Sequence, residues 1–379
     1  MFRERFPFFK QKKKAVYFDS ASSTQKLDSF LEKQDYYSKV YSNVHRSSCI
    51  LSSELTEEFE KSREKIAKTL NVKANEVCFV PSATFGLNLL AFSLNKRKIL
   101  TTSVEHNSNL LPWIENNHVL NVIRSNGLLD YSQINSKAQK NDLVSITHAS
   151  NVTGEVLDLK KLDFLDEIPL ILDSCQYASH AIPDYYKVSA GVFSFHKIFG
   201  GNIGILFVRE DFQKELKKRF AGGGTVSSIN FGNNSLRPEF LDFPIGFEPG
   251  TQNIPAIIAS PYSFEFLKSN QKRIHNHNIS LKKKFLNSLK EFDAVSIKSV
   301  ESGLPIISFE VKGIHSHDLS FLMGEKGFCF RSGDHCAQLL AKELKSNSLN
   351  RISLHCYNSY DEIDSFFNEF SKVLNKLGV

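Results

Sequence analysis

Short apolar runs alternate with helical patterns over the first 210 residues of the chain. The runs predict strands at 15–18, 76–80, 98–102, 119–124, 143–147, 169–172, 188–195 and 204–208. Between them, apolar residues recur at helical spacing, as Leu55, Phe59, Ile66 and Leu70 do in one segment. Regular alternation of strands and helices is typical of an α/β domain with a mostly parallel sheet.

The pattern changes after about residue 260. A lysine-rich helical stretch at 261–292 is followed by strands at 294–298 and 305–312, a helix at 316–325, a strand at 328–331, a helix at 337–345 and a strand at 351–357. A last helix carries an apolar stripe that ends at Leu377 and stops at Gly378. We therefore expect a large domain over 15–258 and a smaller α+β domain built from 1–14 and 259–379.

Composition and charge narrow the function classes. The 379 residues carry a formal charge of only +6, and no basic stripe accompanies a nucleic-acid-binding module. The N-terminus has no apolar core of a signal peptide, and no apolar run reaches bilayer length. We expect a cytoplasmic protein that binds neither nucleic acid nor membrane. The six cysteines and the pairs "HNH" and "HSH" lack metal-ligand spacing, so no metal site is predicted.

Polar side chains follow five of the predicted strands. His106, His148 with Asn151, Asp173 with Gln176, and His196 with Lys197 come directly after four of them, and Ala83 and Thr84 begin a helix after the fifth. In an open α/β sheet, ligands bind outside the carboxyl ends of the strands. These residues are therefore expected to share one site.

Each of these groups suits a phosphorylated aromatic aldehyde. A helix start at Ala83 and Thr84 offers free N–H groups to phosphate. Asp173 can pair with a protonated ring nitrogen, Lys197 can form a Schiff base, and His106 can stack on the ring. Taken singly, the lysine is as readily a surface cation and the aspartate a helix cap. The ordered set is what indicates a pyridoxal phosphate site.

The set resembles the fold-type I pyridoxal phosphate enzymes of the class V aminotransferase family, and within it the group II cysteine desulfurases. The resemblance runs from "VYFDSASSTQK" to "RISLHCYNSYDEID" and implies a large domain with a seven-stranded sheet. It implies that Lys197 bonds the cofactor, Asp173 meets the ring nitrogen, Gln176 and Asn151 meet the ring oxygen, and His106 covers the ring. It assigns the phosphate to Ala83, Thr84, Ser194 and His196, and to Thr251 of a partner subunit in a homodimer.

The same resemblance implies which residues bind the substrate and which one attacks it. "RSGDHCAQ" resembles the loop that carries the catalytic cysteine, which makes Cys336 the expected nucleophile. Ala21, His45, Asn151, Arg331 and Arg351 match substrate-pocket segments, with Arg351 on the substrate carboxylate. The implied reaction converts L-cysteine to L-alanine, leaves a persulfide on Cys336 and passes the sulfur to an acceptor protein, by default for iron–sulfur cluster assembly.

Three residues depart from the family pattern. Asp334 stands where the family has histidine, Phe195 replaces a small residue, and Phe85 replaces an acidic one. A carboxylate at 334 is expected to oppose formation of the Cys336 thiolate. The sequence therefore leaves open a class V aminotransferase, a selenocysteine lyase, and a cofactor-binding scaffold with little turnover.

Overall fold

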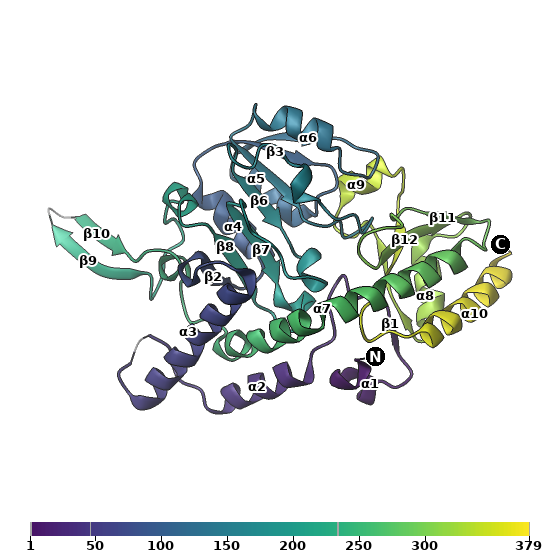
Figure 1. The fold of residues 1–379 in the computed structure, drawn as a ribbon, viewed down its shortest axis with the longest axis horizontal. Coiled ribbons are helices and arrows are strands. Elements are labelled where there is room, and N and C mark those ends of the chain that lie inside the picture. The colour runs from purple at the N-terminus through teal and green to yellow at the C-terminus, as the bar shows by residue number, and fades with distance from the viewer. Residues whose placement is uncertain (1, 46, 233–234, 379) are drawn as a thin grey trace.

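A seven-stranded sheet forms the centre of the computed structural model, which describes residues 2–45, 47–232 and 235–378 (Figure 1). Its strands, in spatial order, are β2 (Val77–Val80), β8 (Gly204–Val208), β7 (Ala190–Ser194), β6 (Leu170–Asp173), β5 (Leu143–Thr147), β3 (Lys98–Thr102) and β4 (Val119–Ile123). The only antiparallel pairings in this sheet are those of β8 with β2 and with β7. The predicted α/β class with a mostly parallel sheet is confirmed.

Helices cover both faces of this sheet, which explains why its central strands are buried along their whole length and mainly apolar. They are α3 (Ile50–Leu70), α4 (Ala83–Ser93), α5 (Leu111–Glu115), α6 (Tyr131–Ala138) and the first part of α7 (Ile254–Leu289). In α4, Leu87 and Leu90 are fully buried in the cluster that also holds Val192 and Leu206 of the sheet. The start of α4 is thereby fixed at the carboxyl end of β2.

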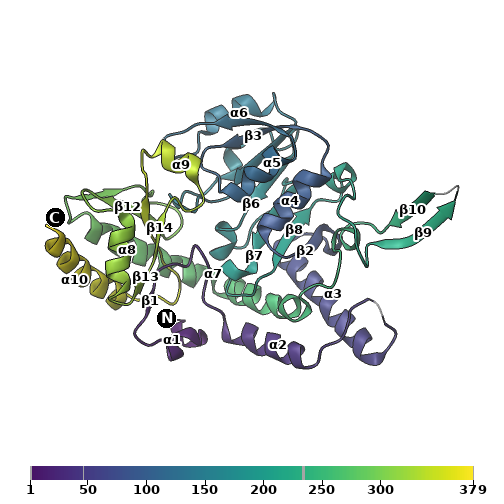
Figure 2. The same ribbon diagram turned by 180° about the vertical axis from the view of Figure 1, so that it is seen from behind.

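The long helix α7 begins earlier than its predicted start at 261. Pro255 occupies its first turn, where a missing N–H costs nothing, and Pro261 lies inside the helix rather than at its start. The helix runs from beneath the large sheet to the second, smaller one (Figures 1 and 2). It is therefore common to both halves of the molecule.

The smaller sheet is antiparallel and has the order β11 (Val295–Ile297), β12 (Ile306–Val311), β15 (Leu349–Ser353) and β14 (Arg331–Gly333). The helices of this half are α8 (Ser316–Gly324), α9 (Gln338–Glu343) and α10 (Tyr360–Leu377). Its separate core contains Phe285, Phe309, Phe366 and Phe370. The division of the chain at residues 14/15 and 258/259 stays a prediction.

The N-terminal segment joins this second half. β1 (Val16–Tyr17) pairs in parallel with β13 (Phe328–Cys329). Where the sequence predicts a single strand at 328–331, the structure has two strands, β13 and β14. The short helix α1 (Phe8–Gln11) precedes β1, and α2 (Asp28–Lys39) follows it and packs on α7. The turn between β1 and α2 thus reaches the boundary between the two sheets.

One hairpin, β9 (Val226–Gly232) with β10 (Ser235–Phe240), projects away from the body of the chain (Figure 1). Ile229, Phe231 and Leu236 on it are largely exposed. No helix among the described residues combines the length and apolarity that crossing a bilayer requires.

Candidate active site

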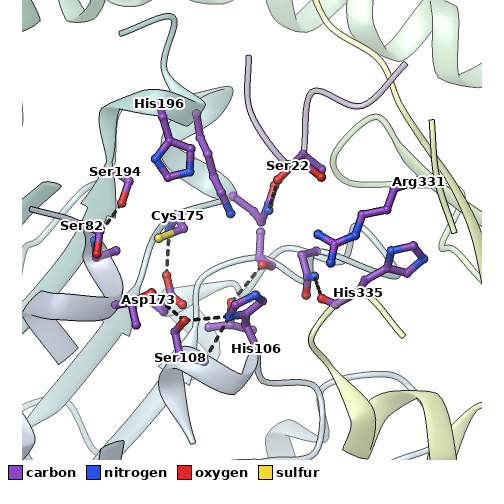
Figure 3. A pocket seen from close by; sticks show the side chains of 18 of the residues that line it. Ser22, Ser82, His106, Ser108, Asp173, Cys175, Ser194, His196, Arg331 and His335 are labelled. Atoms are coloured by element: carbon purple, nitrogen blue, oxygen red, sulfur yellow. Dashed lines mark hydrogen bonds between the residues drawn. The ribbon is translucent and has the colours of Figure 1, made fainter. Parts of the chain in front are cut away.

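The carboxyl ends of five strands open onto one cavity of about 220 Å³ (Figure 3). Twelve of the residues predicted from the sequence line it: Ala21, Ala83, Thr84, His106, Asn151, Asp173, Gln176, Ser194, His196, Lys197, Arg331 and Arg351. They come from segments spread over more than 300 positions of the chain. The sheet topology is what brings them together, as the strand-end rule predicts.

The start of α4 forms one wall of the cavity. Ser82 caps the helix by accepting a hydrogen bond from Phe85 N (3.2 Å), and Ser194 Oγ accepts one from Ala83 N (2.8 Å). Gly204 allows this approach, because a Cβ there would lie 2.6 Å from the carbonyl carbon of Ser82. Thr84 Oγ1 lies 2.8 Å from Ser108 Oγ. Helix N–H groups and hydroxyls at this point form a suitable cradle for a phosphate.

Asp173 ends β6 and is almost fully buried at the cavity floor. Its Oδ1 accepts a hydrogen bond from Cys175 N at 3.0 Å. Burial first, and the nearby Asp173 after it, raise the pKa of Glu105 to about 8, so that Glu105 is protonated at neutral pH.

His106 follows β3 and remains neutral. Its Nδ1 accepts a hydrogen bond from Ser108 N (3.1 Å), and burial, followed by the nearby charge of Lys197, lowers its pKa to about 4. A neutral imidazole is a flat, uncharged surface that suits stacking on an aromatic ring. The same burial, with Lys197 again the next cause, lowers the pKa of His196 to about 4.

Gln176 presents an unused hydrogen-bonding atom to the cavity. Its Nε2 donates to the carbonyl of Ala21 at 2.8 Å, while its buried Oε1 has no partner among the described residues. An amide atom left without a partner at such a depth costs free energy unless a ligand group meets it. The cavity therefore contains a position for a polar ring substituent.

Arg331 lies on the far side of the cavity from Ser82 and Ser194, beside His335 (Figure 3), and Arg351 also lines the cavity. Arg351 is fully buried, and its Nη2 donates to Asp19 Oδ1 (3.1 Å) and Ser22 Oγ (2.8 Å). Its Nε has no partner within the described ranges. Arg351 thus retains a donor for an anionic group such as a carboxylate.

Cys336 lies just behind Arg331 and does not itself line the cavity. Its Sγ is 3.5 Å from Arg331 Nη2, and its thiol is half-buried. The carbonyl of Cys336 accepts a hydrogen bond from Asn107 N (2.8 Å), next to His106. The side chain of Arg331 therefore lies between the thiol and the cavity.

Two predicted residues lie elsewhere. His45 and Thr251 are exposed and border a second cavity of about 260 Å³, which shares no residue with the first. His45 Nε2 lies 3.1 Å from Glu60 Oε1. A single chain does not bring these two residues to its own Lys197.

The three departures from the family pattern lie outside the cavity lining. Phe195 is buried against Phe193 and Phe264, with ring centroids 5.6 and 5.4 Å apart. Phe85 packs on Phe220 at 5.4 Å. Asp334 follows β14 and is half-buried. Phe195 and Phe85 therefore act on packing around the site rather than on its chemistry.

Sequence reasoning missed Ser108, Asp19 and Glu105. Ser108 contacts both Thr84 and His106, and Asp19 pairs with Arg351. Glu105 accepts hydrogen bonds from Thr102 (2.6 Å) and Asn109 (2.7 Å) and anchors the His106 segment. The motif "SVEHNSN" contained the signal, since a glutamate directly beside a site histidine and after a buried strand is unusual.

Among the remaining cysteines, Cys175 alone lines the cavity. Burial and then Asp173 raise the pKa of its thiol, which makes it a poor nucleophile. No group of three or more His, Cys, Asp or Glu side chains suited to a metal ion occurs within residues 2–45, 47–232 and 235–378.

The donor set fits pyridoxal phosphate. The α4 start with Ser194 suits its phosphate, the carboxylate of Asp173 its ring nitrogen, the unpartnered amide oxygen of Gln176 a ring hydroxyl, and Lys197 its aldehyde. These positions occur at different walls of a single small cavity, as one rigid molecule requires.

Comparisons with known proteins agree with this geometry. The family model described as aminotransferase class-V matches residues 16–366. The chain is 31% identical to a cysteine desulfurase of Wigglesworthia glossinidia brevipalpis, covering 98% of this chain and 96% of that protein, and 30% identical to a probable cysteine desulfurase of Borreliella burgdorferi, covering 99% and 96%. The solved structure of a cysteine desulfurase from Thermococcus onnurineus superimposes with a TM-score of 0.92 at 29% identity, covering 99% of this chain and 97% of that one.

Proposed function

The chain belongs to the aminotransferase class-V family, and from this premise we propose that it is a pyridoxal phosphate-dependent cysteine desulfurase. Cysteine desulfurases of this family use that cofactor, and the curated relatives are named for this activity. The observation that carries the proposal is the thiol of Cys336, 3.5 Å from an arginine that lines the cofactor-shaped cavity. An aminotransferase needs no thiol at this position.

Each residue has a defined task in the proposed reaction. When bound, pyridoxal phosphate would supply an electron sink for the negative charge that develops at the substrate Cα. Arg351 binds the carboxylate of L-cysteine, and Asp173 keeps the ring nitrogen protonated. Lys197 removes the Cα proton as a general base and returns a proton later in the reaction as a general acid. Neutral His106 covers the ring and excludes water.

Cys336 performs the sulfur transfer. Its thiolate attacks the substrate sulfur, the new S–S bond forms, and the Cβ–S bond breaks with its electron pair moving to the substrate carbon skeleton. Protonation of that skeleton gives L-alanine, and Cys336 is left as a persulfide. Arg331 Nη2, at 3.5 Å from the sulfur, is the charged group that contacts the nucleophile.

The persulfide then passes to an acceptor. A half-buried thiol in a short loop requires an acceptor thiol that reaches the cavity mouth, so the proposed partner is a protein with an extended, cysteine-bearing segment. We propose further that the protein is cytoplasmic and supplies sulfur for iron–sulfur cluster assembly, as the sequence resemblance implies.

A homodimer completes the proposal. Thr251 and His45 are exposed at a cavity separate from Lys197, and the hairpin β9–β10 extends apolar side chains beyond the body of the chain. These features fit a second copy whose active site receives Thr251. Mixing Thr251→Ala with Lys197→Ala chains should restore one site per mixed dimer, whereas either variant alone lacks one of the two groups. No gain in activity on mixing would oppose the shared site.

The function is tested by release of L-alanine from L-cysteine by the purified cofactor-loaded protein with a reductant. Wild type should release alanine, and Cys336→Ala should keep its cofactor absorbance and lose release by at least about a hundredfold, because the sulfur then has no nucleophile. Cys329→Ala, which removes an exposed thiol from the neighbouring β13, is the matched control and should behave as wild type.

Other outcomes identify the other functions. Accumulation of the amine form of the cofactor with an added oxo acid would indicate an aminotransferase. Turnover of selenocysteine without turnover of cysteine would indicate a lyase for selenium. Bound cofactor with no turnover of either amino acid would indicate a cofactor-binding scaffold protein.

A further inference from the structure

The segment from Arg331 to Ala337 holds the thiol in an unusual backbone conformation. His335 (φ 55°) and Cys336 (φ 56°) are consecutive residues in the left-handed region, and neither is glycine. L side chains adopt this region rarely and only where surrounding contacts hold them there. The position of the Cys336 sulfur therefore depends on what fixes these two residues.

Four hydrogen bonds engage backbone groups of residues 334–336, in addition to the bond from the His335 side chain (Nε2) to the carbonyl of Leu349 (3.2 Å). Asn151 Nδ2 donates to the carbonyl of His335 (2.8 Å), and Asn107 N donates to the carbonyl of Cys336 (2.8 Å). The carbonyl of Asp334 accepts from Ala337 N (3.0 Å), and Asp334 Oδ1 accepts from Cys336 N (3.1 Å). Only the last of these binds the N–H of the nucleophile, and only it comes from a side chain within the turn.

We propose that Asp334 is a positioning residue for the desulfurase reaction, whose carboxylate acts as the hydrogen-bond acceptor that fixes the backbone of Cys336 and aims its sulfur at Arg331. This inference rests on the proposed role of Cys336 as nucleophile. It replaces the sequence-based expectation that the carboxylate acts on the thiol by repulsion, since one of its oxygens is engaged by the Cys336 amide.

The charged groups around the sulfur favour this assignment. Arg331 Nη2 lies 3.5 Å from the sulfur, and Arg351 lines the same cavity as Arg331. His335 is neutral, because burial and then Arg351 lower its pKa to about 2. Arg331 therefore faces the thiol of Cys336, and Asp334 meets its amide.

The chain itself shows why histidine and aspartate are interchangeable in this task. His106 Nδ1 accepts from the N–H two residues later (3.1 Å), and His315 Nδ1 does the same (3.3 Å). Asp334 makes this same contact with the residue two positions on. An aspartate in place of the family's histidine thus preserves the acceptor while changing the charge.

Three variants of the cofactor-loaded enzyme separate the acceptor from the charge. Asp334→Asn keeps an acceptor oxygen without the charge, Asp334→His restores the family residue, and Asp334→Ala removes both acceptor and charge. The readouts are alanine release from L-cysteine and the rate of Cys336 alkylation by iodoacetamide as a function of pH, followed on the Cys336 peptide by mass spectrometry.

If Asp334 acts as an acceptor, Asp334→Ala should release alanine about tenfold more slowly, while the Asn and His variants rescue most of that loss. The pH profile of alkylation should be the same for wild type and Asp334→Asn. Cofactor absorbance should be unchanged in all three, which excludes loss of the fold.

Three results would overturn the proposal. One is full activity of Asp334→Ala. Another is a loss in Asp334→Asn equal to that in Asp334→Ala. The third is a shift of the alkylation profile to lower pH in both uncharged variants, which would restore the repulsion model. Failure of the proposed function is separable, because it would show as no alanine release by wild type, or as alanine release by Cys336→Ala, whatever Asp334 does.

Discussion

The ion pair between Arg63 and Glu248 gives a sharp prediction about what holds the Thr251 segment. Arg63, on α3, donates from Nη1 to Glu248 Oε1 (2.7 Å) and from Nη2 to Oε2 (3.0 Å), and both side chains are almost fully buried. Glu248 Oε1 also accepts from Phe79 N (2.6 Å), at the centre of β2. The pair therefore ties α3 and β2 to the stretch three residues before Thr251.

Arg63→Met removes the cation and leaves the Glu248 carboxylate buried with one backbone donor. Breaking a buried pair in this way costs about 3–5 kcal/mol in the free energy of unfolding. The double variant Arg63→Met/Glu248→Leu removes both charges and leaves the Phe79 N–H without this partner, at about 1–3 kcal/mol. The Val77 carbonyl loses its Arg63 donor (2.7 Å) in both variants, so that loss cancels in the comparison. The double variant should therefore be more stable than Arg63→Met alone.

Urea unfolding of the cofactor-loaded protein, followed by far-ultraviolet circular dichroism, measures these differences. Lys61→Met on the same helix is the control, because its ion pairs with Glu57 and Glu58 are on the surface and should contribute nothing measurable. If Arg63→Met unfolds at the same urea concentration as Lys61→Met, the buried pair does not hold this segment. If the double variant is the least stable of all, the charges are not the source of the cost.

Three shorter predictions concern the cofactor and the pH range. Lys197→Ala should lose the visible absorbance of the lysine-bonded cofactor, and retention of that band would refute the assignment. Gly204→Ala should weaken cofactor binding about tenfold in a fluorescence titration, because its Cβ would lie 2.6 Å from Ser82, whereas Gly324→Ala, with open space around it, should not. Stability should fall as the pH drops from about 6.5 to about 4, measured by thermal unfolding, because burial lowers the folded-state pKa values of several histidines and the unfolded chain then binds more protons. Those with pKa values of about 4 or about 3 are His106, His196, His355 and His148. Glu105 acts in the opposite direction. Because burial raises its pKa to about 8 in the folded chain, its contribution to stability is lost as the pH rises from about 4.5 to 8.

The strands and the cavity were predictable because two strong physical rules govern them. Short, mainly apolar runs such as 143–147 and 204–208 are typical of central strands or buried helices, and their length selects strands. Once the sheet is parallel, the residues after Thr102, Thr147, Asp173 and Ser194 must meet at one edge. That is why His106, Asn151, Gln176 and Lys197 were brought together correctly.

Elements with little apolar periodicity were not predictable. α6 is an eight-residue helix, and much of its stability comes from outside its own pattern: the Asp130 cap and the burial of Ile134 and Ala138. The hairpin β9–β10 exposes its apolar residues, so its strands carry no inward and outward alternation. Such segments take their structure from tertiary contacts or from surfaces beyond the chain, which local patterns do not encode.

Contacts from both sheets together determine the position of the Cys336 thiol. The carbonyl of Cys336 is bound by Asn107, which follows β3 of the large sheet, and the carbonyl of His335 by Asn151, which follows β5. The backbone of the turn itself continues from β14 of the small sheet. A change in how the two sheets meet would therefore move the sulfur relative to the cavity while leaving each sheet intact. The motif "RSGDHCAQ" identifies the nucleophile, but the position of its sulfur is set by contacts from residues about 180 to 230 positions away, and those contacts exist only in the folded chain.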